Sequence, residues 1–276
     1  MFVYVTERGI CHSDAKDAEV LNLVDRDTNL LPYISGDGLE GLARLSVIEK
    51  LPRDEARVLA PVSRPGQFII AGLNYRAHCE EIGRPVPSRL VFGTAPGGAA
   101  HPHSVPVVLP QNASAEVDYE GEIALVIAKT ARHVAREDAW RYVAGVCALN
   151  DVSARDVQAG GTLEAVGQAK GFPTFKPFGP CLATPDEFAD RSDIGIRTWV
   201  NGELRQHGRS ADMVFSLPEI IELVSAKLAL APGDVICTGT PGGVAHGGKH
   251  PYLVDGDVVE IEVEGLPLLR NRFVTG

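Results

Sequence analysis

Apolar residues along this chain fall mostly in short runs that are separated by glycine and proline. The runs are rich in β-branched and aromatic residues, which fit the half-buried surface of a sheet. They predict strands at residues 2–5, 67–75, 105–110, 122–128, 196–201, 234–240 and 257–265. A further apolar run, at 143–149, is typical of an interior strand. The pattern therefore predicts a mainly β fold.

Two segments have the spacing of short helices. The first covers Glu137 to Val143. The second begins with Ser216 and Glu219, a capping-box pair, and continues with Ile221, Val224 and Leu228 on one face. The turn at 231–234 is expected to end it. With these helices the fold class is α+β: mainly β with short helices.

The chain divides near Pro65. Residues 1–65 contain no candidate for chemistry, and 61–66 has the composition of a linker. We therefore expect a small N-terminal domain at 1–65 and a catalytic domain at 66–276.

Charge and cysteine content limit the possible partners. The formal net charge of −10 disfavours nucleic acid and anionic membranes but allows bound cations. Five scattered cysteines, with no C-x-x-C pair, fit a reducing cytoplasm better than a disulfide framework. No apolar run approaches the roughly 18 residues that span a bilayer. The expectation is a cytoplasmic protein with neither a nucleic-acid nor a membrane partner.

Three carboxylates form a candidate metal site. Glu120 and Glu122 alternate at the start of a predicted strand and would share one face. Two close, buried carboxylates repel each other unless a cation lies between them, and Mg²⁺ and Mn²⁺ prefer oxygen ligands. The alternative is a solvated face of an edge strand. Asp151, which follows the apolar run 143–149, is a natural third ligand.

Five blocks, taken together, resemble the signature of the fumarylacetoacetate hydrolase family. The blocks are DYEGEIALVI at 118–127, NDVSARDVQ at 150–158, AKGF at 169–172, VNGELRQHG at 200–208 and PGDVICTGTPGGV at 232–244. The resemblance implies a mixed β-roll or β-sandwich core and a homodimer. It also implies that Glu120, Glu122 and Asp151 hold one Mg²⁺ or Mn²⁺ and leave positions for two substrate oxygens.

The resemblance also supplies an acid-base group. His78 and Glu81 lie three residues apart and would share a helical face, although a solvated surface histidine is the simpler alternative. The family's H-x-x-E pair, a general base with its orienting carboxylate, falls on these two residues. Lys170 matches the family's active-site lysine, whose ammonium would stabilise developing negative charge.

Further residues are candidates for substrate binding. Gly239 and Thr240 lie in a turn where backbone N–H groups and a hydroxyl could receive a substrate carboxylate. Arg76, Arg155 and Gln158 could orient the substrate, or could make only structural hydrogen bonds and ion pairs.

The segment 243–250 nearly spells a phosphate-binding loop. His250 replaces the required Ser or Thr, and Pro251 opposes the helix that must follow. We therefore do not expect nucleotide binding.

Two positions depart from the family pattern. Gly93 stands where many members have a lysine after a phenylalanine, so Arg89, His101 or His103 could serve on this side. Pro173 stands where members often have an acidic residue.

The implied activity is hydrolysis of a carbon–carbon bond in a small oxo-acid. A β-diketo acid such as an acylpyruvate would be attacked by water that His78 activates, leaving an enolate held by the metal and Lys170. This activity belongs to oxo-acid metabolism and aromatic catabolism. Decarboxylation and isomerisation or hydration of oxo-acids are alternatives within the family, and a catalytically silent scaffold is an alternative from another class.

Overall fold

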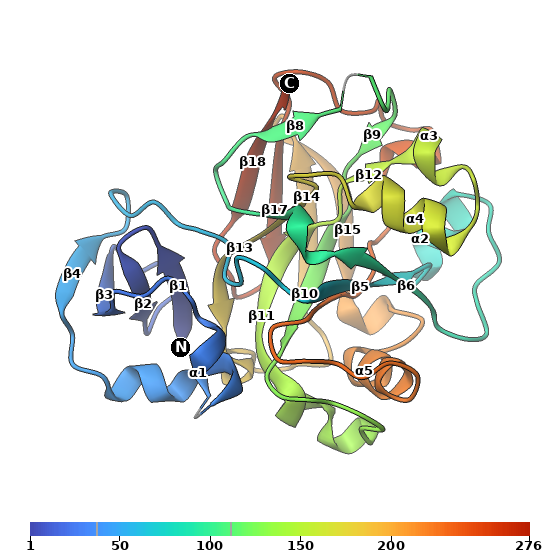
Figure 1. Ribbon diagram of the computed structural model, residues 1–276. Helices are drawn as coiled ribbons and strands as arrows, with labels where there is room; N and C mark the ends of the chain where they lie inside the picture. The colour runs from blue at the N-terminus through green and yellow to red at the C-terminus, as the bar shows by residue number, and fades with distance from the viewer. Residues whose placement is uncertain (37, 111) are drawn as a thin grey trace.

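A large mixed sheet runs through the molecule (Figure 1). The computed structural model describes residues 1–36, 38–110 and 112–276. Within these residues the sheet has 11 strands, of which β7 (Ala100–His101) pairs with β13 outside the main path. The main path is β4 (Glu49–Pro52), β3 (Val20–Asp25), β2 (Gly9–Ser13), β1 (Phe2–Thr6), β13 (Lys176–Ala183), β11 (Val143–Asn150), β10 (Gly121–Ile127), β16 (Val235–Cys237), β5 (Gln67–Gly72) and β6 (Val91–Pro96).

A second sheet packs on one face of the first. Its order is β15 (Glu203–Arg209), β14 (Gly195–Val200), β17 (Val258–Val263), β18 (Leu269–Thr275) and β8 (Val107–Leu109). Ile123 and Leu125 of β10 share a hydrophobic cluster with Ile261 of β17 and Phe273 of β18. A short pair, β9 (Val117–Asp118) with β12 (Ser153–Ala154), completes the strands of the described chain. The architecture is thus mainly β, with two packed sheets, as the sequence predicts.

Strand β10 is covered on both faces. Ile123 and Leu125 face the cluster between the sheets, whereas Ala124 and Val126 face a second cluster with Phe68. A strand covered on both faces has a continuous apolar sequence, which explains why the run after Glu122 lacks polar alternation. This strand starts at the candidate metal site.

The helices are short and lie mostly at the ends of strands (Figure 1). The α-helices are α1 (Leu31–Ser35), α2 (Arg76–Glu81), α3 (Arg155–Gln158), α4 (Leu163–Lys170) and α5 (Leu217–Ser225). The 3₁₀ helices are η1 (Leu39–Arg44), η2 (Gly97–Ala99), η3 (Arg136–Tyr142), η4 (Pro185–Glu187), η5 (Ser210–Asp212) and η6 (Ala245–Gly247). None of the helices in the described part of the chain is long and apolar enough to cross a membrane.

Both predicted helical segments form, but one differs from the prediction in helix type and the other in length. The segment predicted at 137–143 is the 3₁₀ helix η3, and Val143 instead begins β11. The capping box of Ser216 and Glu219 opens α5 as predicted. However, α5 ends at Ser225 rather than near residue 231, because the chain turns so that Leu230 can pair with Ala131.

The N-terminal residues join the main sheet. β1 pairs antiparallel with β13, with Phe2 opposite Ala183 and Val3 opposite Leu182. Val3 also shares a hydrophobic cluster with Phe178 of β13. The first four strands therefore extend the central sheet at one end, coloured blue in Figure 1. The domain boundary near Pro65 stays a prediction.

Candidate metal centre

Three buried carboxylates meet where β10 begins and β11 ends. The two strands are antiparallel, with Gly121 opposite Asn150, so the residues flanking this pair come together. Glu120 is 5% exposed, Glu122 1% and Asp151 0%. One oxygen from each carboxylate lies within 4.8 Å of the others. The solvated edge strand that the sequence left open is thus not what forms here.

Two lysines bring positive charge to this cluster. The Nζ of Lys170, at the end of α4, lies 2.5 Å from Oε2 of Glu120 and 2.6 Å from Oδ2 of Asp151. Burial alone would lower the pKa of Lys170, but Asp151 and Glu120 outweigh it and raise that pKa. Lys176, the first residue of β13, places its Nζ 2.6 Å from Oδ1 of Asp151. Both oxygens of Asp151 therefore contact an ammonium.

Arg155 forms ion pairs with Glu120 of the cluster and with the neighbouring Asp118. The Nε of Arg155 donates to Oδ2 of Asp118 at 2.9 Å, and its Nη2 lies 2.7 Å from Oε1 of Glu120. Arg155 also donates to Gln158 at 2.9 Å. Arg155 is thus engaged in the ion pairs that the sequence analysis left open as its alternative. Substrate binding by Arg155 and Gln158 stays a prediction.

Glu122 differs from the other two carboxylates. In the described chain no lysine or arginine lies within ion-pair distance of it, and its Oε2 accepts the backbone N–H of Gly239 at 3.0 Å. Burial, followed by the charges of Asp151 and Glu120, raises its pKa well above the usual range. For Glu120, burial raises the pKa, but Lys170 and Arg155 outweigh it and lower the pKa.

The cluster fits a hard divalent cation. The donors are carboxylate oxygens, which Mg²⁺ and Mn²⁺ prefer, and they lie close enough together to share one ion. Glu122 also carries an electrostatic penalty that a second positive charge would relieve. The cluster of Glu120, Glu122 and Asp151 could therefore hold a metal ion.

His78 and Glu81 lie on α2, as their spacing predicts. The Nδ1 of His78 is 3.8 Å from Oε2 of Glu81, and the two side chains are 8% and 7% exposed. Burial raises the pKa of Glu81, but His78 and the backbone N–H of Gly243 outweigh it and lower the pKa. The pair is linked to the cluster through the backbone of residues 243–246, which donates N–H groups both to Glu81 and to Asp118, the partner of Arg155.

The other predicted substrate-binding residues have different surroundings. Gly239 donates its N–H to Glu122, as described above. The buried hydroxyl of Thr240 donates to the carbonyl of Gly121 at 2.9 Å and accepts from Gln206 at 2.7 Å. Arg76 is exposed at the start of α2. These contacts give Gly239 and Thr240 structural roles, and their contact with substrate stays a prediction.

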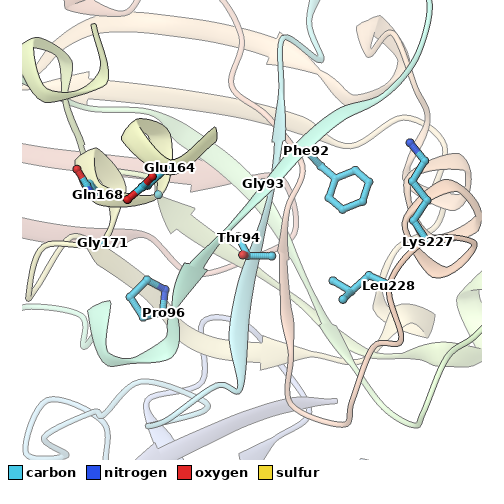
Figure 2. A pocket seen from close by; sticks show the side chains of 10 residues that line it. Phe92, Gly93, Thr94, Pro96, Glu164, Gln168, Gly171, Lys227 and Leu228 are labelled. Carbon is cyan, nitrogen blue, oxygen red and sulfur yellow. Dashed lines mark hydrogen bonds between the residues drawn. The ribbon is translucent and has the colours of Figure 1, made fainter. Parts of the chain in front are cut away.

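Gly93 lies in an open surface groove with a volume of about 740 Å³ (Figure 2). Strand β6, helix α4 and the residues after α5 line it, and Phe92 points toward Lys227 and Leu228. The Nζ of Lys227 lies 5.7 Å from the centre of the Phe92 ring. Lys227 is therefore a cation close to the position where the lysine is missing.

The candidates named for that missing lysine are engaged elsewhere or exposed. The Nε2 of His101 lies 3.1 Å from the carbonyl oxygen of Val105, and Nδ1 of His103 accepts the backbone N–H of Arg270. Arg89 is exposed. Pro173 lies in the turn between α4 and β13, which carries the chain from Lys170 to Lys176.

Two members of this site were missed in the sequence. Lys176 is fully buried, and its signal was a single lysine between Phe175 and Phe178 in an otherwise apolar run. Asp118 is also fully buried, but it was hidden in an acidic stretch that already contained Glu120 and Glu122.

Comparison with known proteins gives the family. The family described as fumarylacetoacetate (FAA) hydrolase C-terminal matches residues 67–274. A Bos taurus protein named oxaloacetate tautomerase FAHD2B, mitochondrial, is 40% identical over 245 residues, which cover 85% of this chain and 77% of that protein. The chain therefore belongs to the fumarylacetoacetate hydrolase family, and it is an enzyme of that family.

Two solved structures have the same fold. The fumarylacetoacetate hydrolase of Exiguobacterium antarcticum is 33% identical, with a TM-score of 0.86 and full coverage of both chains. The maleylpyruvate hydrolase of Sphingobium sp. SYK-6, in complex with manganese(II) and pyruvate, is 30% identical, with a TM-score of 0.80 and the same coverage. The mixed fold implied by the resemblance is thereby confirmed.

Proposed function

We propose that this chain is a divalent-metal-dependent enzyme that interconverts the enol and keto forms of a small 2-oxo acid, with oxaloacetate as the first substrate to test. The observation that carries this proposal is the placement of the Lys170 ammonium between two carboxylates of the cluster, together with a His78–Glu81 pair that residues 243–246 link to Asp118. The 40% identity to a protein named oxaloacetate tautomerase supports the choice of reaction.

The residues divide the chemistry between charge and proton transfer. A Mg²⁺ or Mn²⁺ ion held by the three carboxylates would act as a Lewis acid on the 2-oxo group. The Lys170 ammonium provides a second positive charge for the oxygen that becomes negative in the enolate. His78 adds or removes the proton at carbon 3, and Glu81 orients its ring. The enol oxygen loses a proton when carbon 3 gains one, so tautomerisation consumes no water.

Hydrolysis of an acylpyruvate is the second candidate. It needs a base that activates water, and the His78–Glu81 pair meets that need as well. The similarity to a maleylpyruvate hydrolase solved with pyruvate and manganese(II) favours this reaction and a manganese ion. The two reactions share an enolate and differ in whether water attacks a distal carbonyl and a carbon–carbon bond breaks.

One assay distinguishes the reactions. Metal-stripped protein is supplied with Mn²⁺ or Mg²⁺ and mixed with the enol form of oxaloacetate or with acylpyruvates, while ultraviolet absorbance follows substrate loss and a coupled assay measures pyruvate. A tautomerase removes the enol signal without making pyruvate, a hydrolase converts acylpyruvates to pyruvate, and a decarboxylase makes pyruvate from oxaloacetate.

Variants connect the activity to the site. Glu122→Ala should abolish the metal-dependent rate, whereas Glu40→Ala, at an exposed position in η1, should leave it intact. Equal rates with and without metal, or an unimpaired Glu122→Ala, would refute the assignment. Manganese binding without turnover of any substrate would favour the silent scaffold.

Two expectations from the sequence stay predictions here. The homodimer is one, and gel filtration with light scattering measures it. The cytoplasmic location is the other, and the Bos taurus relative is named mitochondrial.

A further inference from the structure

Residues 243–247, here called the bridging segment, contact both Glu81 of the acid-base pair and Asp118, which binds Arg155 next to the metal cluster. They begin the segment whose sequence resembles a phosphate-binding loop. The backbone N–H of Gly243 donates to both oxygens of Glu81, at 3.0 and 2.9 Å. The N–H groups of Ala245 and His246 donate to the two oxygens of Asp118, at 2.9 and 3.0 Å. One short segment therefore donates hydrogen bonds both to Glu81 of the acid-base pair and to Asp118 next to the metal cluster.

Asp118 is connected through Arg155 to Glu120, a candidate metal ligand. Asp118 binds Arg155, and Arg155 contacts Glu120 at 2.7 Å. The bridging segment is itself anchored there, because the hydroxyl of Tyr119 donates to the carbonyl oxygen of Gly243 at 2.7 Å. The position of Glu81 is thus set relative to Glu120 through the backbone of residues 243–246 and the side chains of Asp118 and Arg155.

A Cβ would meet neighbouring atoms closely at two glycines of the bridging segment. Gly243 has a φ of +108°, and a Cβ there would overlap the carbonyl oxygen of Arg205. A Cβ at Gly247 would overlap Cγ and Cδ of Glu81 and come within 2.6 Å of its Oε1. Gly247 therefore leaves the space in which the Glu81 carboxylate lies. A side chain at position 247 must push that carboxylate away.

We propose that Gly243 and Gly247 are positioning residues that hold Glu81 against His78 at a fixed place beside the carboxylate cluster. The inference rests on the proposed function, in which Glu81 orients His78. In the described chain the Nδ1 of His78 has no hydrogen-bond partner, and Glu81, at 3.8 Å, is its ion-pair neighbour. Displacement of Glu81 consequently leaves the imidazole without its orienting group.

The first test compares two alanine variants in the same loop. Gly247→Ala forces Glu81 to move, whereas Gly242→Ala is the matched control, because its Cβ would meet only Ala77, at an ordinary 3.4 Å. A positioned general base contributes roughly 10²- to 10⁴-fold to a rate. We expect Gly247→Ala to lower kcat at least tenfold, with little change in KM or in Mn²⁺ affinity, and Gly242→Ala to behave like the native protein. A native kcat for Gly247→Ala would overturn the proposal.

A double variant separates positioning from general damage to the loop. Glu81→Ala removes the atoms that a Cβ at position 247 would meet. The double variant Glu81→Ala/Gly247→Ala should therefore be no slower than Glu81→Ala alone, whereas additive losses would overturn the proposal. If Gly247→Ala alone does not fold, recovery of folding in the double variant supports the clash with Glu81, and failure of both overturns it.

A measurement on metal-free protein does not depend on turnover. The ring NMR signals of His78, identified by their loss in His78→Ala, should shift in both Gly247→Ala and Glu81→Ala and stay in place in Gly242→Ala. Unshifted signals in Gly247→Ala would overturn the inference. If the native protein turns over none of the tested substrates while these shifts occur, the proposed reaction is wrong and the positioning of Glu81 stands.

Discussion

Binding of a divalent ion should release a proton from Glu122. Burial and the neighbouring Asp151 and Glu120 raise the pKa of Glu122, so below that pKa the metal-free protein carries a proton there. The pKa of Glu120 is lowered, so this carboxylate stays ionised and does not compete for that proton. A metal ion requires the carboxylate form, so metal and proton compete at Glu122.

The structure sets the size of this linkage. With one protonated ligand, the apparent Kd for Mn²⁺ should rise about tenfold for each pH unit below the pKa of Glu122, which corresponds to about 1.4 kcal/mol per unit. Above that pKa the Kd should become constant. The sign follows from the raised pKa: acid favours the protonated, metal-free form, and affinity is lost as the pH falls.

Calorimetry measures the released proton directly. Mn²⁺ is titrated into metal-stripped protein in buffers with different ionisation enthalpies, and the slope of the observed enthalpy gives the number of protons, which should approach one below the pKa of Glu122. Glu122→Gln should release none, and the exposed control Glu40→Gln should release as many as the native protein. Proton release from Glu122→Gln equal to that of the native protein, or a Kd that stays constant as the pH falls toward the usual pKa of a glutamate, would refute the reasoning.

Three further predictions concern the ion pairs and one helix cap. Asp118→Ala removes one of the two carboxylate partners of the buried Arg155 guanidinium, and urea denaturation should show that the free energy of unfolding falls by about 3–5 kcal/mol; a decrease below about 1 kcal/mol would contradict this. Lys176→Met removes one of the two ammonium groups that contact Asp151, so the variant should unfold at a lower temperature than the native protein. Saturating Mn²⁺ should restore most of the lost melting temperature, because the ion supplies the missing positive charge. An equally lowered melting temperature in the presence of Mn²⁺ would contradict this explanation. Ser216→Ala breaks the capping box of α5 and should lower the free energy of unfolding, measured in urea, by about 1 kcal/mol without changing kcat. An altered kcat would mean that α5 affects the site.

The sequence predicted the central strands β10 and β11 but did not predict the edge strand β15. β10 and β11 have continuous apolar runs because both of their faces are covered. Strand β15, by contrast, is the edge of the second sheet and contains Glu203, Arg205, His207 and Arg209, so no apolar run marked it. Its pairing with β14 forms it, and that contact is absent from local sequence.

The candidate site likewise contains residues that the sequence predicted and residues that it did not. Glu120, Glu122 and Asp151 were found because like charges alternate beside an apolar run and recur at the end of another. Lys176 has no such local signal, because its partner Asp151 lies 25 positions earlier in the chain and the two meet only when β13 pairs with β11. For Arg155 the sequence left substrate binding and a structural ion pair open, because it did not show that Asp118, which binds Arg155, is buried.

The arrangement of charge supports the proposed enolate chemistry. Four carboxylates, those of the cluster and Asp118, lie with three cations, Arg155, Lys170 and Lys176, so the set carries one net negative charge once Glu122 has lost its proton. A divalent ion bound there would change this to one net positive charge among buried side chains. Under the proposed function, the carboxylate of a 2-oxo acid would offset this positive charge, and the negative charge that forms on the oxo oxygen would meet an ammonium already fixed by Glu120 and Asp151. Because these charges are held by the fold before substrate arrives, little reorganisation is needed when the enolate forms.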